Sequence, residues 1–195
     1  MSDTKFKLLH KPAKGKMGGL LIVFLWIAIW NVVYQAVHGL WAESEIQIVN
    51  WAFFAAVTLF FMQEELTYKE RFWHTMVGGT VGLVLAAGVG FVCTVLITGG
   101  MNHTLAVCIP LVAVIAALIL AHPYLPMIFN NVGFIYLIVA FVESDKVVSN
   151  LPSYIVSLVL GSLILNLGSS FFIGLYTKAL TKKAIAAAKA EKINQ

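Results

Sequence analysis

The sequence is short of charge. Of its 195 residues, 11% are Asp, Glu, Lys or Arg, and 60% are hydrophobic. A soluble globular domain has about 25% charged and about 45–50% apolar residues. The shortage excludes an ordinary soluble fold, a nucleic-acid-binding protein and a disordered chain. The formal net charge of +4 therefore does not indicate a polyanionic partner.

Charge is also missing where an ion-driven pump would need it. No Asp, Glu, Lys or Arg lies in the middle of any long apolar run. Ionisable side chains at such depth mark proton relays and ion-coupled sites in membrane proteins. Without one, a proton-driven pump is hard to build.

The residue patterns of enzymes and metal sites are missing as well. The two cysteines, Cys93 and Cys108, lie within apolar segments, so a disulfide framework is not expected. The five histidines include no pair at the i, i+4 spacing of a helical metal site. The sequence has no nucleophile elbow, phosphate-binding loop or dinucleotide fingerprint. We therefore expect no enzyme activity, cofactor or metal.

The chain does contain six apolar runs. A transmembrane helix needs roughly 20 apolar residues. The pattern predicts an all-α integral membrane protein with six transmembrane helices in a lipid bilayer. Residues 1–18 would form a basic arm, residues 19–177 the membrane domain and residues 178–195 a basic helical tail. The predicted helices cover residues 19–38, 46–62, 75–97, 104–121, 126–142 and 153–177.

Positive charge is distributed very unevenly around these runs. If all six helices cross, twelve of the thirteen Lys and Arg residues fall on one side, and only Lys146 falls on the other. Lysine and arginine mark the cytoplasmic side of a membrane protein. Both termini are therefore predicted to be cytoplasmic, in a multi-pass protein of a bacterial inner membrane. The twelve are Lys5, Lys7, Lys11, Lys14, Lys16, Lys69, Arg71, Lys178, Lys182, Lys183, Lys189 and Lys192.

Aromatic residues gather near the ends of the same runs. Trp41, Trp51 and Tyr154 lie near the outer ends. Rings of this kind favour the headgroup level of a bilayer. We interpret them as an anchoring belt.

The two halves of the chain resemble each other. With an offset of 81 residues, Asn50 aligns with Asn131 and Phe53 with Phe134; with an offset of 82, Gly79 aligns with Gly161. Three helices per copy would insert the second copy upside down, as in the inverted repeats of transporters. The pattern is consistent with a 3+3 inverted repeat. A chance match between apolar helices, which share a small set of residues, is the alternative.

Small residues recur at helical spacing in two of the runs. Such residues let helix backbones approach closely, and close packing drives association where lipid is as apolar as the protein. We predict helix contacts here, either within the chain or in a homo-oligomer; the wall of a narrow pore is the alternative. The residues are Gly78, Gly82, Ala86 and Gly90 in one run, and Gly161 and Gly168 in the other.

Neutral polar residues lie deep in several runs. Hydrogen bonds between helices would account for them individually. As a set, uncharged donors and acceptors could replace water around a small solute without trapping an ion. The predicted path residues are Asn31, Tyr34, Gln35, Asn131, Tyr136 and Asn166. Because histidine titrates near neutral pH, His38 and His103 are candidates for a gate that senses external pH.

The second half carries a family resemblance. The segment from Asn131 through VGFIYLIVAFVESDKVVSNLPSYIVSLVLGSLILNLGSSFF resembles the end of a family of small bacterial inner-membrane proteins of unknown function. NWAFFAAVTLFF and the glycine-rich run after it resemble the middle of that family. The similarity covers roughly residues 20–177. The family is similar to the membrane domains of aromatic-acid exporters and fusaric-acid-resistance proteins, which implies transport and assigns no functional residue.

Taken together, these features favour a passive channel or facilitator for a small neutral solute or weak acid. One alternative is a secondary exporter of an organic, aromatic acid. Another is a non-transporting membrane subunit or scaffold that binds a partner through the lysine-rich tail.

Overall fold

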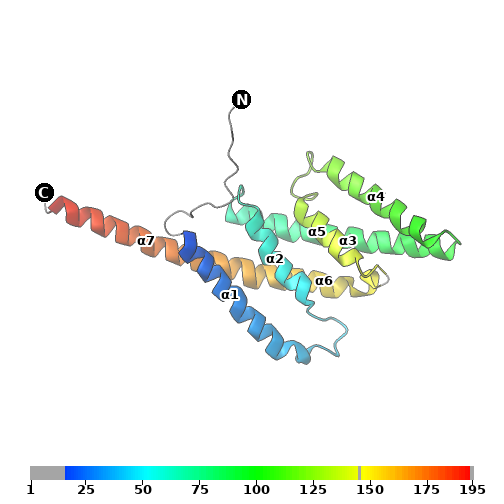
Figure 1. Ribbon diagram of the computed structural model, residues 1–195, viewed down its shortest axis with the longest axis horizontal. Coiled ribbons are helices and arrows are strands. Elements are labelled where there is room, and N and C mark those ends of the chain that lie inside the picture. Colours follow the sequence, from blue (N-terminus) through cyan, green and yellow to red (C-terminus); the bar gives the residue numbers. More distant parts are fainter. Residues whose placement is uncertain (1–15, 145, 194–195) are drawn as a thin grey trace, which may run out of the picture.

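The computed structural model describes residues 16–144 and 146–193, and these residues are all-helical without strands (Figure 1). Four of the predicted basic residues, Lys5, Lys7, Lys11 and Lys14, lie outside the described residues. The elements are α1 (Lys16–Val37), the 3-10 turn η1 (His38–Leu40), α2 (Asn50–Met62), α3 (Tyr68–Thr98), α4 (His103–Ala121), α5 (Asn131–Phe141), α6 (Val147–Gly161), the π-helical turn η2 (Ser162–Asn166) and α7 (Leu167–Ile193).

The described residues contain four helical stretches that are long and apolar enough to cross a membrane. Large apolar side chains stay exposed along α1 and α4, as the lipid-facing surface of a membrane protein requires. The four stretches are Met17–Leu40, Tyr68–Thr98, His103–Ala121 and Val147–Ala186.

The other two helices, α2 and α5, are shorter than predicted. They have 13 and 11 residues and rise about 20 and 16 Å, whereas a hydrocarbon core is about 30 Å thick. The residues before α2 are extended, because the backbone N–H groups of Gln47 and Val49 donate to serine hydroxyls of α6. Before α5, Asn130 acts as the N-cap and excludes residues 126–130 from the helix.

The last helix is longer than predicted. The expected span of residues 153–177 is the middle of one continuous helical rod that begins at Val147 and ends at Ile193. Pro152 is the sixth residue of α6; it has no N–H to donate to the carbonyl oxygen of Val148, so the helix continues past it with one backbone bond missing. The rod therefore continues through the described part of the basic tail.

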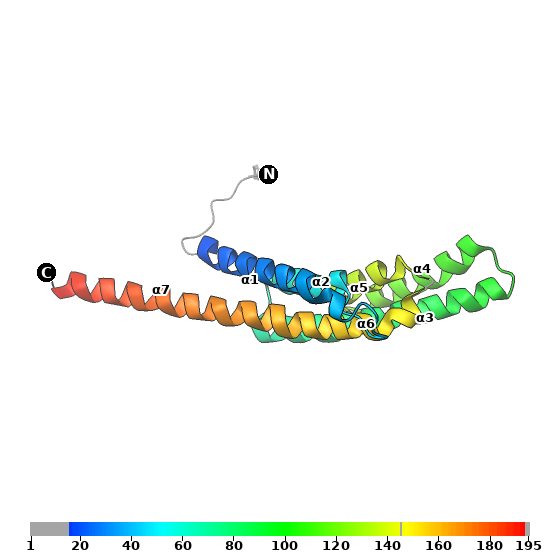
Figure 2. The same ribbon diagram turned by 90° about the horizontal axis from the view of Figure 1, so that it is seen from below.

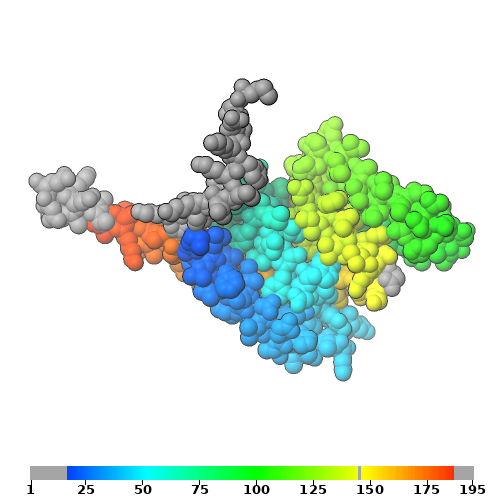
Figure 3. Space-filling view, in the orientation of Figure 1, coloured from blue at the N-terminus to red at the C-terminus, as the bar shows by residue number. Residues whose placement is uncertain are grey.

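The helices form two layers. The rod α6–η2–α7 and α3 lie in one layer, and α1, α2, α5 and α4 lie in the other (Figure 2). Within the first layer, α3 and α6 lie side by side and run in opposite directions (Figure 1). In the second layer, α1 and α4 lie at opposite ends of the face, with α2 and α5 between them (Figure 3).

Two contacts between helix backbones hold the layers together. A Cβ atom on Gly82 of α3 would overlap the carbonyl oxygen of Gly133 in α5. A Cβ atom on Gly161 of α6 would overlap the carbonyl oxygen of Phe53 in α2. Each glycine therefore permits an approach that no other residue allows.

The other predicted packing residues also face segments of this chain. Gly78 lies against the Asn130 side chain, Gly90 against Val147 and Gly168 against the ring of Trp26, while Ala86 is fully buried. These contacts are made within one chain, so a homo-oligomer would need other surfaces.

The aromatic residues divide between core and surface. Tyr154 is buried, and the ring centroid of the half-buried Trp51 lies 5.1 Å from that of Tyr154 and 5.7 Å from that of Tyr136. Trp51 and Tyr154 thus pack between α2, α5 and α6 instead of joining the expected belt, while Trp41 is half-buried beside Tyr34, with 5.9 Å between the ring centroids.

Candidate functional site

The buried polar side chains of the described residues are all uncharged. Five of the seven lie in the last rod; of the other two, Thr75 lies in α3, and Asn130 caps α5, which packs on α3. The set comprises Thr75, Asn130, Ser153, Ser157, Ser162, Asn166 and Ser169. A site built from them would offer hydrogen bonds without a fixed charge.

The last rod is interrupted in its middle by the π-helical turn η2. Such turns insert one extra residue into an α-helix and are frequent at functional sites. The indole Nε1 of Trp26 in α1 donates to the carbonyl oxygen of Ile164 within this turn, at 3.1 Å. The predicted path residue Asn166 ends the turn and is fully buried.

Several buried polar atoms around η2 have no hydrogen-bond partner. Both amide atoms of Asn166, Oδ1 and Nδ2, belong to this group, as do the hydroxyls of Ser162 and Ser169 and the indole nitrogen of Trp30. Spacings of four and three residues place Ser162, Asn166 and Ser169 on one face of the rod. An unpartnered buried polar group costs about 1–3 kcal/mol. We term Ser162, Asn166 and Ser169 the buried polar stripe. Because their unpartnered groups lower the stability of the fold, stability alone does not account for this cluster.

A polar cleft of about 640 Å3 opens where α2 ends and α5 begins. Its walls include Gln63 after α2, His74 of α3, His122 after α4, and Asn130 and Asn131 at the start of α5. An adjoining hollow of about 260 Å3 shares His122 and both asparagines. We term the larger space the inner cleft, because it lies at the end of the helices that the distribution of Lys and Arg predicts to face the cytoplasm. Glu64 and Glu65 also line it.

Gln63 reaches from the inner cleft into the core. Its Nε2 atom donates to the backbone oxygen of Leu59 at 3.0 Å and to the Oγ1 atom of the fully buried Thr75 at 3.1 Å. A Cβ atom on Gly79 would lie 2.8 Å from the side chain of Leu158. Gly79 of α3 therefore faces Leu158 of α6. Because the two helices are antiparallel, Thr75, one turn before Gly79, lies at the same level as Ser162, one turn after Leu158. The bond from Gln63 to Thr75 thus brings polar groups to the level of Ser162, the first residue of the last rod's π-helical turn.

The two neighbouring asparagines of the cleft differ in role. The Asn130 side chain caps α5 by accepting from the backbone of Gly133 at 3.0 Å, and it donates to the carbonyl oxygens of His74 and Met127, both at 3.1 Å. Asn131, the predicted path residue, is exposed in the cleft. Of these two asparagines, only Asn131 has a side chain that could contact a solute in the cleft.

The remaining predicted path residues do not converge on the buried polar stripe. Asn31 and Gln35 are exposed on α1. Tyr34 is half-buried and donates to the backbone oxygen of Ile48 at 2.8 Å. Tyr136 is fully buried and donates to the backbone oxygen of Ala52, also at 2.8 Å, which joins α5 to α2.

The candidate pH-sensing histidines lie at separate exposed turns. His38 follows α1, where its Nδ1 atom lies 2.8 Å from the backbone oxygen of Gln35. His103 is the exposed first residue of α4. Within residues 16–144 and 146–193, no group of three or more His, Cys, Asp or Glu residues could hold a metal ion.

Sequence reasoning missed Gln63, Thr75 and Ser169. Ser169 lies three residues after Asn166, so helical periodicity could have placed it on the same face. Thr75 and Gln63 lie near a helix end, where polar side chains are ordinary, and no sequence signal separates them from solvent-facing residues.

No family model, curated protein or solved structure matches this chain.

Proposed function

We propose that this protein is a membrane facilitator for a small, neutral, polar solute. The solute would enter through the inner cleft and exchange hydrogen bonds with the buried polar stripe. Asn166 would supply the central donor and acceptor, and Asn131 would meet the solute at the entrance.

The observation that carries this proposal is the pair of unpartnered amide atoms on the fully buried Asn166. Such atoms destabilise a fold unless something else uses them. An amide in this state suits a solute that both donates and accepts hydrogen bonds. The absence of charged side chains from the buried polar residues of the described chain favours a neutral solute over an ion.

A 3+3 inverted repeat is part of the proposal, and matched contacts in the two halves support it. The contact between Gly82 and Gly133 joins α3 to α5, and the contact between Gly161 and Phe53 joins α6 to α2. This matching pairs Gly82 with Gly161, about one helical turn from the pairing that the sequence offsets give. Transporters with such repeats place their sites near the interface of the halves, which is where α2, α3 and η2 meet.

The starts of α2 and α5 support the same relationship. The start of α2 is tied to α6 by the bond from the Val49 N–H to Ser157 Oγ, at 2.6 Å. The start of α5 is tied to α3 by the bond from Asn130 to the His74 oxygen. Each short helix is thus tied at its start to the long helix of the other half.

The test is solute flux into liposomes that contain the purified protein. Stopped-flow light scattering would follow swelling with a panel of urea, amides, polyols and short-chain acids. We expect fast, non-saturating flux for one class of uncharged solute, with empty liposomes and an inactive Asn131→Leu variant as controls. The variant should keep the elution volume of the wild type.

Other outcomes would contradict the facilitator. Saturable flux that follows an ion gradient would favour the exporter of an organic acid. An absence of flux for every solute, together with a partner that co-purifies through the tail, would favour the scaffold.

A further inference from the structure

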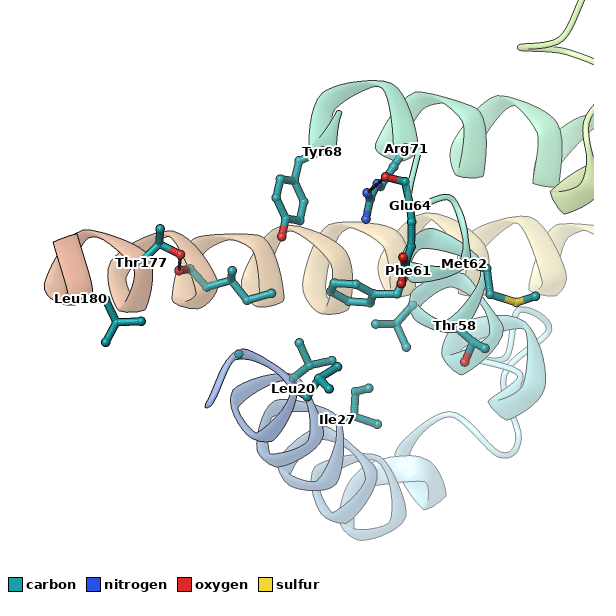
Figure 4. Close-up of a pocket in the computed structure, with 14 residues that line it drawn as sticks. Leu20, Ile27, Thr58, Phe61, Met62, Glu64, Tyr68, Arg71, Thr177 and Leu180 are labelled. Carbon is teal, nitrogen blue, oxygen red and sulfur yellow. Dashed lines mark hydrogen bonds between the residues drawn. The ribbon is translucent and has the colours of Figure 1, made fainter. Parts of the chain in front are cut away.

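An apolar groove lies between α1, α2 and α7, near the start of α1 (Figure 4). Its volume is about 900 Å3. We term it the α1 groove. Its apolar walls are formed by Leu20, Val23, Ile27, Val57, Phe61, Ile173 and Leu180.

Two contacts between α1 and α7, one near each end of the α1 groove, set the distance between these helices. At one end, Gly18 lies against the ring of Tyr176. At the other end, the ring of Trp26 lies against Gly168: a Cβ atom added to Gly168 would lie 2.6 Å from the ring. The Nε1 atom of Trp26 donates a hydrogen bond to the carbonyl oxygen of Ile164. The spacing of α1 from the bundle is therefore built by specific contacts.

Polar groups gather where α2 leads into α3. Glu64, Tyr68 and Arg71 line this end of the α1 groove (Figure 4). The Arg71 guanidinium donates to the backbone oxygens of Leu66 and Glu64, both at 2.7 Å, and lies 5.3 Å from the centroid of the Tyr68 ring. These carbonyl acceptors are neutral, so the bonds orient the guanidinium without cancelling its charge.

A second hollow, of about 830 Å3, adjoins the first. Tyr68, Ile173 and Thr177 line both hollows, and Lys178 and Lys182 line the second one. Three positive side chains thus lie around this end, against the single carboxylate of Glu64 within the α1 groove.

The length of the α1 groove suits one leaflet of a bilayer. Its α1 wall, from Gly19 to Ile27, rises about 12 Å, and half of a hydrocarbon core is about 15 Å. An apolar slot of this length with positive charge at its headgroup end matches an acyl chain that carries an anionic headgroup. We propose that the α1 groove binds an anionic phospholipid, with one acyl chain along α1 and its phosphate near Arg71, Lys178 and Lys182.

Native mass spectrometry of the full-length, delipidated protein in detergent tests this proposal. The protein would be mixed with equal amounts of phosphatidylglycerol and phosphatidylcholine with identical acyl chains. We expect the wild type to retain the anionic lipid at least five-fold more than the zwitterionic one. The double variant Lys178→Gln, Lys182→Gln should reduce this preference by about five-fold or more, because each cation near a headgroup contributes about that factor.

Two further variants separate the α1 groove from general surface adhesion. Val23→Trp, which fills the groove, should reduce retention of both lipids. Lys146→Gln, which removes a charge at the far end of the last rod, should change neither. Equal retention of the two lipids by the wild type, lipid retention that Val23→Trp leaves unchanged, or a lipid preference that the double variant Lys178→Gln, Lys182→Gln leaves unchanged would each overturn the proposal. Solute flux has no bearing on this result.

Discussion

The indole Nε1 of Trp26 lies 3.1 Å from the carbonyl oxygen of Ile164 and donates a hydrogen bond to it. The Ile164 oxygen also accepts from the backbone N–H of Leu167 within the rod, so the indole N–H, supplied by another helix, adds a second hydrogen bond at the π-helical turn. Gly168 leaves the space for the ring. This pair thus fixes both the place of α1 and one wall of the α1 groove.

Replacing Trp26 should loosen this attachment. Trp26→Phe keeps an aromatic ring but removes the donor, and we expect a loss of about 1–2 kcal/mol from the hydrogen bond and packing. Thermal unfolding in detergent would measure it. Trp73→Phe, at a position with 47% of its surface exposed, is the matched control. Equal unfolding temperatures for the two variants would mean that the Trp26 bond contributes nothing.

Two glycines of α3 should differ in how much the same change destabilises the protein. Gly82→Ala pushes a methyl group against the carbonyl oxygen of Gly133, whereas a Cβ atom on Gly88 meets nothing within 4 Å. We expect Gly82→Ala to cost about 1–3 kcal/mol, as overpacking does, and Gly88→Ala to stay within about 1 kcal/mol of the wild type. Chemical unfolding in mixed micelles would give both values. Similar stabilities would show that α3 and α5 do not pack at Gly82.

The asparagines at the start of α5 offer a second matched pair. Asn130→Ala removes a helix cap and two bonds to carbonyl oxygens, so we expect a loss of about 1–3 kcal/mol. Asn131→Leu alters only an exposed side chain of the cleft. It should leave the unfolding temperature unchanged and lower solute flux. Unfolding curves and flux from the same preparations decide; a stability loss in Asn131→Leu as large as that in Asn130→Ala would contradict the division of roles.

Hydropathy was sufficient to predict the all-helical fold and the number of helical rods, because apolar runs of this length have few alternatives. It was wrong about the starts of α2 and α5. The start of α2 depends on Ser153 and Ser157, whose hydroxyls accept hydrogen bonds from backbone N–H groups over 100 residues away. The start of α5 depends on the local cap made by Asn130. Runs of apolar residues carry no information about such bonds.

The functional residues were predictable only in part. Asn166 stands out because an amide in the middle of an apolar run must find a hydrogen-bond partner, but from the sequence alone a bond to another helix would account for it as well as a solute would. The sequence could not show that Asn31 and Gln35 face outwards, since α1 is apolar on all sides. Nor could it indicate the π-helical turn, because Ser162–Asn166 has the composition of an ordinary helix.

The central claim is that Asn166 serves a solute and does not hold the fold together. The most direct test measures unfolding temperature and solute flux for Asn166→Leu, with Asn31→Leu as the exposed control. Because the amide has no partner to lose, replacing it with an apolar side chain of similar size should leave stability unchanged or raise it. Flux should fall at least ten-fold in Asn166→Leu and remain normal in Asn31→Leu. A destabilised Asn166→Leu variant that retains flux would contradict the claim.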